Sequence, residues 1–179
     1  AKGEMDSAAI KRCFYGTAQT TGMIFMIFLG ADMLNSALAL SQMPTQLANI
    51  VSSLPMPPLM VIVCILLFYV VLGCVMDELS MIILTIPVLF PSVMALDLWG
   101  LDPTDKAVWF GILVLCVVEF GLIAPPVGLN VYVINSLARD VPMSETYRGV
   151  VPFLISDVVR VTLLMCFPIL SLWLVHLIT

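Results

Sequence analysis

The sequence predicts an all-α integral membrane protein with transmembrane helices, a re-entrant hairpin and a discontinuous helix. Hydrophobic residues make up 61% of the chain and charged residues 11%, whereas about 25% of residues are charged in soluble domains. Several apolar blocks approach the roughly 20 residues that cross a bilayer as a helix. One block contains GLIAPPVGLN, residues 121–130, whose paired prolines must break a helix. Lipid tolerates such a break only where it lines a protein cavity or an ion.

The first third of the chain contains one crossing. Residues 1–13 are expected to form a cytoplasmic connection, which looks like the middle of a longer protein, and residues 14–40 a transmembrane helix. The uncharged segment 41–58 is expected to be a periplasmic connection at the membrane interface, because it contains Pro44, Pro55, Pro57 and Pro58.

A re-entrant hairpin is predicted over residues 59–96, with its tip near 73–80. The apolar run 59–72 is short for a full crossing, and the second arm contains Pro87 and Pro91. Two short arms around a polar tip suit a hairpin that enters and leaves by the same face. The alternative is one tilted span followed by a kinked one.

The last part of the chain is predicted to cross twice. A periplasmic loop at 97–105 precedes a discontinuous transmembrane helix at 106–138, broken at 121–128. A cytoplasmic loop at 139–151 leads to a final transmembrane helix at 152–178, with Pro152 in its first turn and Pro168 as a kink.

The basic residues orient these elements. Lys and Arg flank the ends assigned to the cytoplasm, whereas the loops 41–58 and 97–105 contain neither, although Lys106 adjoins the second. The positive-inside rule then places the N-terminal end in the cytoplasm and the C-terminus outside. Two full crossings in place of the hairpin would give the same orientation, so the charges leave both alternatives open.

The break exposes backbone groups that can bind ions. A discontinuous helix presents free carbonyls at the end of its first half, here near Gly121, Leu122 and Ile123. Free N–H groups begin its second half, near Val127. The carbonyls suit a hard cation such as sodium, and the N–H groups suit an anionic group.

The residues around the break fit this interpretation. Pro125 and Pro126 make the interruption permanent, Gly121 and Gly128 permit close approach, and Asn130 adds a side-chain amide oxygen. Secondary transporters place their sites in broken helices near the bilayer midplane, so the pattern indicates transport. The alternative is a proline kink between packed helices, which needs no ligand.

Three acidic residues are candidates beside the break. Asp77, at the hairpin tip, is costly within a membrane unless it is paired, neutralised or bound to a cation. In an ordinary exposed loop, Asp77 and Glu78 would carry no such cost. Glu119 lies two residues before Gly121 and either acts as a ligand or organiser of the break or forms a hydrogen bond with neighbouring backbone.

Other polar and sulfur-containing residues favour structural roles. Asp32 and Asn35 are expected to be solvated near the outer interface, and His176 to be interfacial rather than a proton relay. The clustered methionines of the first span indicate packing. The five cysteines form no CxxC pair and are expected to be small buried hydrophobes rather than metal or redox ligands: Cys13, Cys64, Cys74, Cys116 and Cys166.

Two segments resemble the large membrane subunit of TRAP (tripartite ATP-independent periplasmic) transporters, in its C-terminal half. They read LGCVMDELSMIILTIPVLFPSV and WFGILVLCVVEFGLIAPPVGLNVYV. The resemblance extends over nearly the whole chain. It implies two inverted repeats of an elevator-type ion-transporter fold, of which this chain holds only the second.

The resemblance also implies a sodium site between the hairpin tip and the broken helix. The matching positions are Gly73, Asp77, Gly121, Ile123, Pro125, Val127 and Gly128. Such proteins commonly have Thr before the two prolines, where this chain has Ala124, so only a backbone carbonyl can act at that position.

The sequence therefore predicts a permease subunit of a sodium-coupled secondary transporter in the bacterial inner membrane, a multi-pass protein and not an enzyme. The resemblance implies a small membrane subunit, a periplasmic substrate-binding protein and an organic-acid substrate such as a dicarboxylate or sugar acid. No cofactor besides the coupling sodium ion and no nucleic-acid partner is expected. The alternatives are another anion symporter or a channel, and less favourably an intramembrane hydrolase, because GxSG and HExxH motifs are absent.

Overall fold

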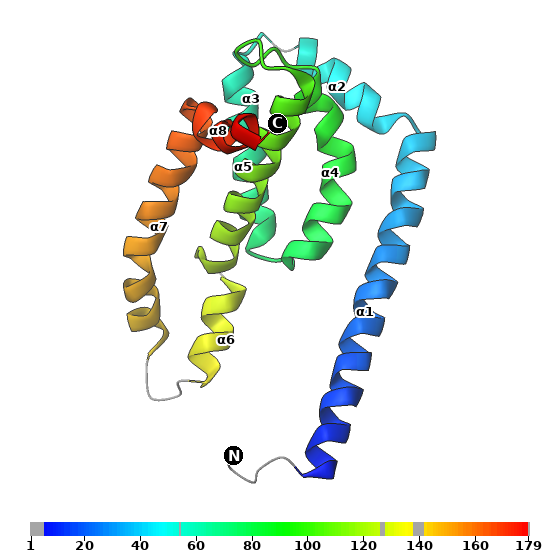
Figure 1. The fold of residues 1–179 in the computed structure, drawn as a ribbon, viewed down its shortest axis with the longest axis vertical. Helices are drawn as coiled ribbons and strands as arrows, with labels where there is room; N and C mark the ends of the chain where they lie inside the picture. The colour runs from blue at the N-terminus through cyan, green and yellow to red at the C-terminus, as the bar shows by residue number, and fades with distance from the viewer. Residues whose placement is uncertain (1–5, 54, 126–127, 138–141, 179) are drawn as a thin grey trace.

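The chain folds into α-helices, which confirms the predicted fold class. The computed structural model describes residues 6–53, 55–125, 128–137 and 142–178, and every regular element in these residues is an α-helix. In chain order the helices are α1 (Ser7–Leu40), α2 (Met43–Ser53), α3 (Pro58–Gly73), α4 (Glu78–Met94), α5 (Pro103–Ile123), α6 (Leu129–Leu137), α7 (Met143–Cys166) and α8 (Ile169–Ile178) (Figure 1).

Three of the described helices, α1, α5 and α7, are long and apolar enough to cross a membrane. The helices α3 and α4 are also apolar but have only 16 and 17 residues. At a rise of 1.5 Å per residue they reach about 24–26 Å, short of the roughly 30 Å of a hydrocarbon layer. The chain is an all-α membrane protein in which long and short apolar helices are combined.

The two short helices form a hairpin. Figure 1 shows α3 and α4 joined by a turn at their lower ends, with their upper ends near α2. The turn is level with the interruption between α5 and α6. The turn runs from Cys74 to Asp77, between the end of α3 and the start of α4. The placement of this hairpin within a bilayer, as a re-entrant element, stays a prediction.

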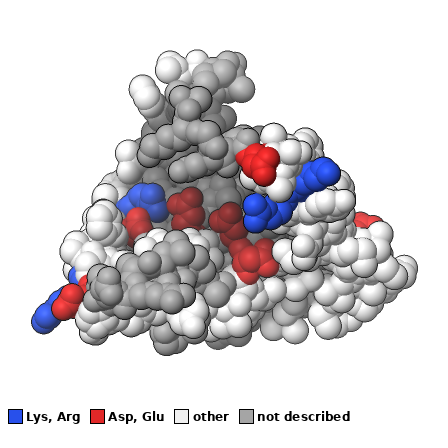
Figure 2. All heavy atoms as spheres, turned by 90° about the horizontal axis from the view of Figure 1, so that it is seen from below, with Lys and Arg blue, Asp and Glu red and all other residues white. Residues whose placement is uncertain are grey.

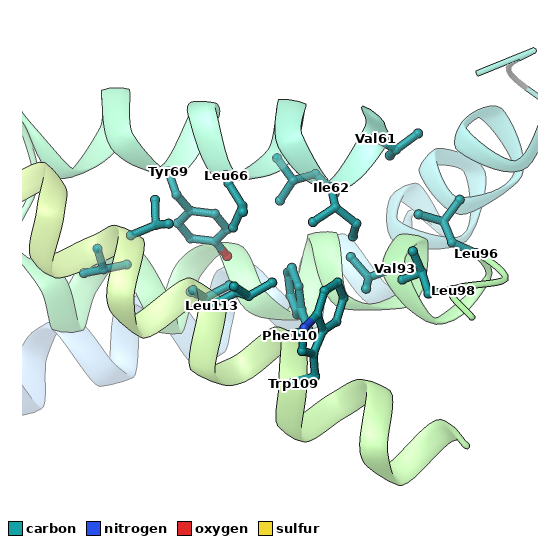
Figure 3. Close-up of a cluster of buried hydrophobic side chains, with 14 of the residues drawn as sticks. Val61, Ile62, Leu66, Tyr69, Val93, Leu96, Leu98, Trp109, Phe110 and Leu113 are labelled. Atoms are coloured by element: carbon teal, nitrogen blue, oxygen red, sulfur yellow. The ribbon is translucent and has the colours of Figure 1, made fainter. Parts of the chain in front are cut away.

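A cluster of buried apolar side chains holds α3, α4 and α5 together (Figure 3). Ile62 and Tyr69 of α3 pack with Trp109 and Phe110 of α5, and all four side chains have no exposed surface. The Tyr69 hydroxyl shares a hydrogen bond of 2.8 Å with the hydroxyl of Thr85 on α4, so its polar atom is satisfied within the cluster. The core therefore joins the hairpin firmly to the first half of the discontinuous helix.

The long helices α1 and α7 lie outside this core. Ala31 is the one buried residue of α1, and α7 has none, although both helices are apolar enough to span a membrane. Large side chains such as Phe25 and Phe153 are exposed on them. These surfaces need an apolar environment, which lipid or further protein supplies.

The structure differs from the expected boundaries around the last span. We expected a loop over 139–151 and a helix from Pro152, but α7 begins at Met143 and contains Pro152 in its interior. The chain then breaks at Pro168 into α7 and α8 instead of kinking. Pro168 removes the N–H that would bond the Leu164 carbonyl, and the Trp109 indole N–H donates to that carbonyl instead, at 2.9 Å.

The earlier boundaries differ as well. The helix α1 begins at Ser7, before the apolar stretch that starts at residue 14, because the Asp6 side chain caps it by accepting from the Ser7 N–H at 2.7 Å. The connection 41–58 contains the helix α2. Hydropathy marks the apolar part of a helix, whereas capping sets its end.

The expectation of buried cysteines is wrong for most of them. Cys74 is buried, whereas Cys116 is half-buried and Cys13, Cys64 and Cys166 are exposed. In a soluble fold, an apolar segment is expected to be buried in the protein core. In a membrane protein, lipid can surround the same segment, so apolarity does not predict contact with other protein.

Candidate ion site at the hairpin tip and the helix break

The break between α5 and α6 follows from proline chemistry. Pro125 and Pro126 lack an N–H, so the carbonyl of Gly121 has no donor four residues ahead. The carbonyl of Leu122 has none three or four residues ahead. Ala124, extended at φ −75° and ψ 139°, ends the helix by donating to the Phe120 carbonyl at 2.9 Å and the Gly121 carbonyl at 3.3 Å. The break thus frees carbonyl oxygens at the end of α5.

Gly128 closes the other side of the break. Its φ of +51° is a left-handed conformation that residues with a side chain rarely adopt. A Cβ placed there would lie 3.2 Å from the carbonyl oxygens of both Ile123 and Ala124. Its own carbonyl accepts from the Tyr132 N–H at 2.9 Å and so starts α6. The glycine therefore lets two carbonyls of the first half approach the start of the second.

The hairpin tip lies directly against the end of α5. A Cβ on Gly121 would stand 2.8 Å from the Cα of Gly73 and 3.2 Å from the Val70 carbonyl oxygen. A Cβ on Gly73 would stand 3.0 Å from the Cα of Gly121. Both glycines are buried. Only glycine allows the two backbones to approach this closely, so this contact fixes the tip beside the freed carbonyls.

Cys74 belongs to this contact, although the sequence predicted only a structural role for it. Its Sγ lies 3.7 Å from the Ala124 carbonyl oxygen and 4.0 Å from that of Pro125, and 5% of its surface is exposed. The thiol is therefore a weak donor to the carbonyls of the break. Its position directly after Gly73, in the polar tip rather than an apolar arm, was the available signal.

The acidic residues of the tip are exposed, and Asp77 acts as the N-cap of α4. Its Oδ2 accepts from the Ser80 N–H at 3.0 Å, and Glu78 lies in the first turn of the helix. Both carboxylates favour a helix N-terminus, where the N–H groups are unpaired. Capping therefore explains the position of Asp77 structurally.

The structure brings together most of the predicted site residues. Gly73 meets Gly121, and Gly128 meets the backbone of Ile123 and Ala124, within the distances above. Pro125 contributes a carbonyl beside Cys74. Asn130 is exposed on α6, and Val127 lies outside the described residues. Cation binding by these residues stays a prediction.

The donor set of this region favours backbone oxygen. The described residues contain no group of three or more His, Cys, Asp or Glu side chains that could hold a metal. The groups that the break presents are backbone carbonyl oxygens, which suit sodium. Seen from below in the orientation of Figure 1, the molecule has a hollow with acidic side chains inside it and basic ones around it (Figure 2). Acidic groups in a hollow raise the local concentration of cations.

The remaining polar candidates fall elsewhere. Glu119 and Asp32 are exposed. His176 pairs with Asp105 at 3.0 Å and so joins α8 to the start of α5. Asn35, expected to be solvated, is half-buried and donates to the Ile83 carbonyl of α4 at 3.3 Å. The expectation for Asn35 is wrong because α4 packs on that part of α1.

A membrane fold with a discontinuous helix is typical of secondary transporters. The family model described as "Tripartite ATP-independent periplasmic transporter, DctM component" matches residues 1–170. The chain therefore belongs to this family, which consists of transporter subunits and not of enzymes.

Three relatives illustrate the similarity. A putative TRAP transporter large permease protein of Haemophilus influenzae is 31% identical over 89% of this chain and 38% of its own length. The sialic acid TRAP transporter large permease protein SiaM of Vibrio cholerae is 29% identical over 90% and 36%. The C4-dicarboxylate TRAP transporter large permease protein DctM of Pseudomonas aeruginosa is 30% identical over 87% and 35%. The chain spans little more than a third of the length of these relatives.

Proposed function

We propose that this chain is part of the large permease subunit of a sodium-coupled secondary transporter that imports organic acids. The names of two relatives refer to sialic acid and C4-dicarboxylates, and both kinds of compound carry carboxylates. In this proposal a periplasmic binding protein delivers the substrate, and a small membrane subunit completes the transporter in the bacterial inner membrane.

The contact between Gly73 and Gly121 is the observation that carries the proposal. It places the hairpin tip beside carbonyls that the two prolines deprive of helical partners. Within a membrane, unpaired carbonyls are costly unless water or an ion meets them. Sodium bound there would be held by both the hairpin and the discontinuous helix, and so would stabilise their joint arrangement.

Coupling follows from this shared binding. If the arrangement that sodium stabilises is also the one that accepts the organic acid, each ligand raises the affinity for the other. The hairpin and α5 share one core, so we infer that they move together as one body, as in an elevator-type mechanism. The ion residues in this proposal are Gly73, Asp77, Gly121, Ile123, Ala124, Pro125, Val127, Gly128 and Asn130.

Two substitutions test the site in the full transporter. Asp77→Asn and Gly128→Leu should each lower sodium-driven uptake in proteoliposomes at least about tenfold, the factor that 1.4 kcal/mol of lost binding produces. Two controls match them. Asp102→Asn alters the N-cap of α5, and Gly100→Leu alters another glycine at positive φ, +65°, with nothing within 4 Å of its Cβ position. The controls should retain sodium-driven uptake.

Unchanged sodium dependence in both variants would contradict the site. Uptake that needs neither a sodium gradient nor the binding protein would identify a channel instead.

A further inference from the structure

The returning arm of the hairpin, α4, contains a carbonyl that its own helix cannot satisfy. Pro87 lies inside α4 and has no N–H, so the Ile83 carbonyl lacks its normal donor four residues ahead. Such a carbonyl inside a membrane protein needs a donor from a neighbouring helix or from water. The position of that donor therefore matters for where the arm can lie.

Asn35 of α1 supplies the donor. Its Nδ2 lies 3.3 Å from the Ile83 carbonyl oxygen, and its Oδ1 is buried without a hydrogen bond in the described part of the chain. A buried amide oxygen without a partner is unfavourable. Among the hydrogen-bonding groups of this side chain, the Nδ2 group has a partner, which is the carbonyl that Pro87 leaves free. We therefore infer that this bond holds the side chain in its position.

The face of α1 that contains Asn35 is otherwise apolar. In the second half of α1, the residues that lose exposure lie three and four apart along this face: Ile24, Ile27, Ala31, Asn35 and Leu38. Asn35 is the polar member of this face, and its bond to Ile83 is the one side-chain hydrogen bond from α1 to another helix among the described residues. Apolar contacts allow two helices to slide, whereas this bond specifies one register.

A similar pairing occurs at Pro168. Pro168 frees the Leu164 carbonyl of α7, and the Trp109 indole N–H of α5 meets it at 2.9 Å. Trp109 is fully buried in the core, so the packing around its side chain holds this second hydrogen bond in place. The pairing of Asn35 lies instead between the core and the sparsely buried helix α1.

We propose that Asn35 is a positioning residue that sets the register of the hairpin against α1 by donating to the carbonyl that Pro87 frees. The contact is made in the arrangement described here and is lost when the hairpin moves along α1. This inference rests on the proposed transport function, which requires the hairpin to move. Asn35 is not one of the proposed ion residues, so it acts on the rate of transport and not on sodium affinity.

A double-mutant cycle in the full transporter tests the proposal. Asn35→Leu removes the donor and keeps the branched shape of the side chain. It should lower the maximal rate of uptake about threefold, the effect of an average hydrogen bond between membrane helices. The sodium concentration for half-maximal uptake should not change. Pro87→Ala restores the N–H that the Ile83 carbonyl lacks, so Asn35→Leu should have no further effect in that background.

Two further variants keep the result interpretable. Asn35→Gln retains an amide donor and should keep most of the rate. Ser36→Ala, at the exposed neighbour on α1, should have no effect. If Asn35→Leu does not insert, Asn35→Ala takes its place in the cycle.

Equal effects of Asn35→Leu with and without Pro87→Ala would overturn the proposal, as would a change in sodium affinity alone. If sodium does not drive uptake in the unaltered protein, the proposed function fails. The cycle is then measured on the rate of substrate exchange, and coupling there would support the role of Asn35.

Discussion

Single residues shape the candidate ion site mainly by the side chains they lack. Gly73 and Gly121 bring two backbones together where one Cβ would already lie 2.8 Å from a neighbouring Cα. Gly128 adopts a φ of +51° beside two carbonyl oxygens. Because backbone atoms and not side chains form the contact, substitutions with small residues are the sharpest probes.

Gly121→Ala should separate the hairpin tip from the break. Its Cβ would meet rigid backbone, so we expect a loss of about 1–3 kcal/mol in stability, as for other enlarged residues in tight packing, together with weaker sodium dependence of uptake. Thermal unfolding in detergent and uptake assays measure the two effects.

Gly111→Ala is the matched control for this prediction. Gly111 lies on the same helix, α5, with nothing within 4 Å of its Cβ position. Alanine there should raise stability by about 0.5–1 kcal/mol. Equal stability changes at both positions would show that the tip does not contact the break.

At the scale of helices, polar side chains satisfy the helix ends. Lys106 is buried, and its Nζ donates to the Leu96 carbonyl at 2.6 Å and approaches that of Met94 at 3.4 Å. A cation at this place stabilises the C-terminal end of α4. The same contact explains why a lysine directly follows the loop 97–105, which itself contains no Lys or Arg.

Lys106→Met should therefore destabilise the hairpin. The carbonyls at the end of α4 would lose a charged donor, and we expect a loss of about 1.5–3 kcal/mol. Unfolding midpoints in lipid nanodiscs measure it. Lys106→Arg keeps a positive donor and should retain most of the stability. A midpoint that does not change for Lys106→Met would contradict the capping role.

At the scale of the molecule, exposed tryptophans mark a membrane interface, and the basic residues indicate which side it faces. Trp99, in the loop after α4, and Trp173, on α8, are both more than half exposed and belong to the end of the molecule opposite the N-terminus (Figure 1). Tryptophan favours the membrane interface. This end is the periplasmic one in the orientation that the positive-inside rule predicts.

Cysteine labelling tests that orientation. In a background whose native cysteines are replaced by alanine, Asp97→Cys should react with an impermeant thiol reagent from the periplasmic side of intact cells. Arg148→Cys should react only after the membrane is permeabilised. Both positions are exposed, so access decides the result. Labelling of both residues from the same side would contradict the topology.

Sequence analysis was sufficient to predict the fold class, the helix break and the polar tip. These features depend on composition and on proline and glycine, whose effects are local. The break at residues 121–128 follows from two missing N–H groups, which no environment restores. The apolar arms of the hairpin follow from hydropathy in the same way.

The contacts between residues distant in sequence could be identified only from the folded arrangement. The approach of Gly73 to Gly121, the contact of Cys74 with the break and the bond from Asn35 to Ile83 each join residues about 50 apart in the chain. Hydropathy cannot predict such contacts in a membrane protein, because lipid and protein are equally apolar surroundings for a helix. Which residues come into contact depends on close packing and on the hydrogen-bond donor that each freed carbonyl requires. Both depend on the folded arrangement.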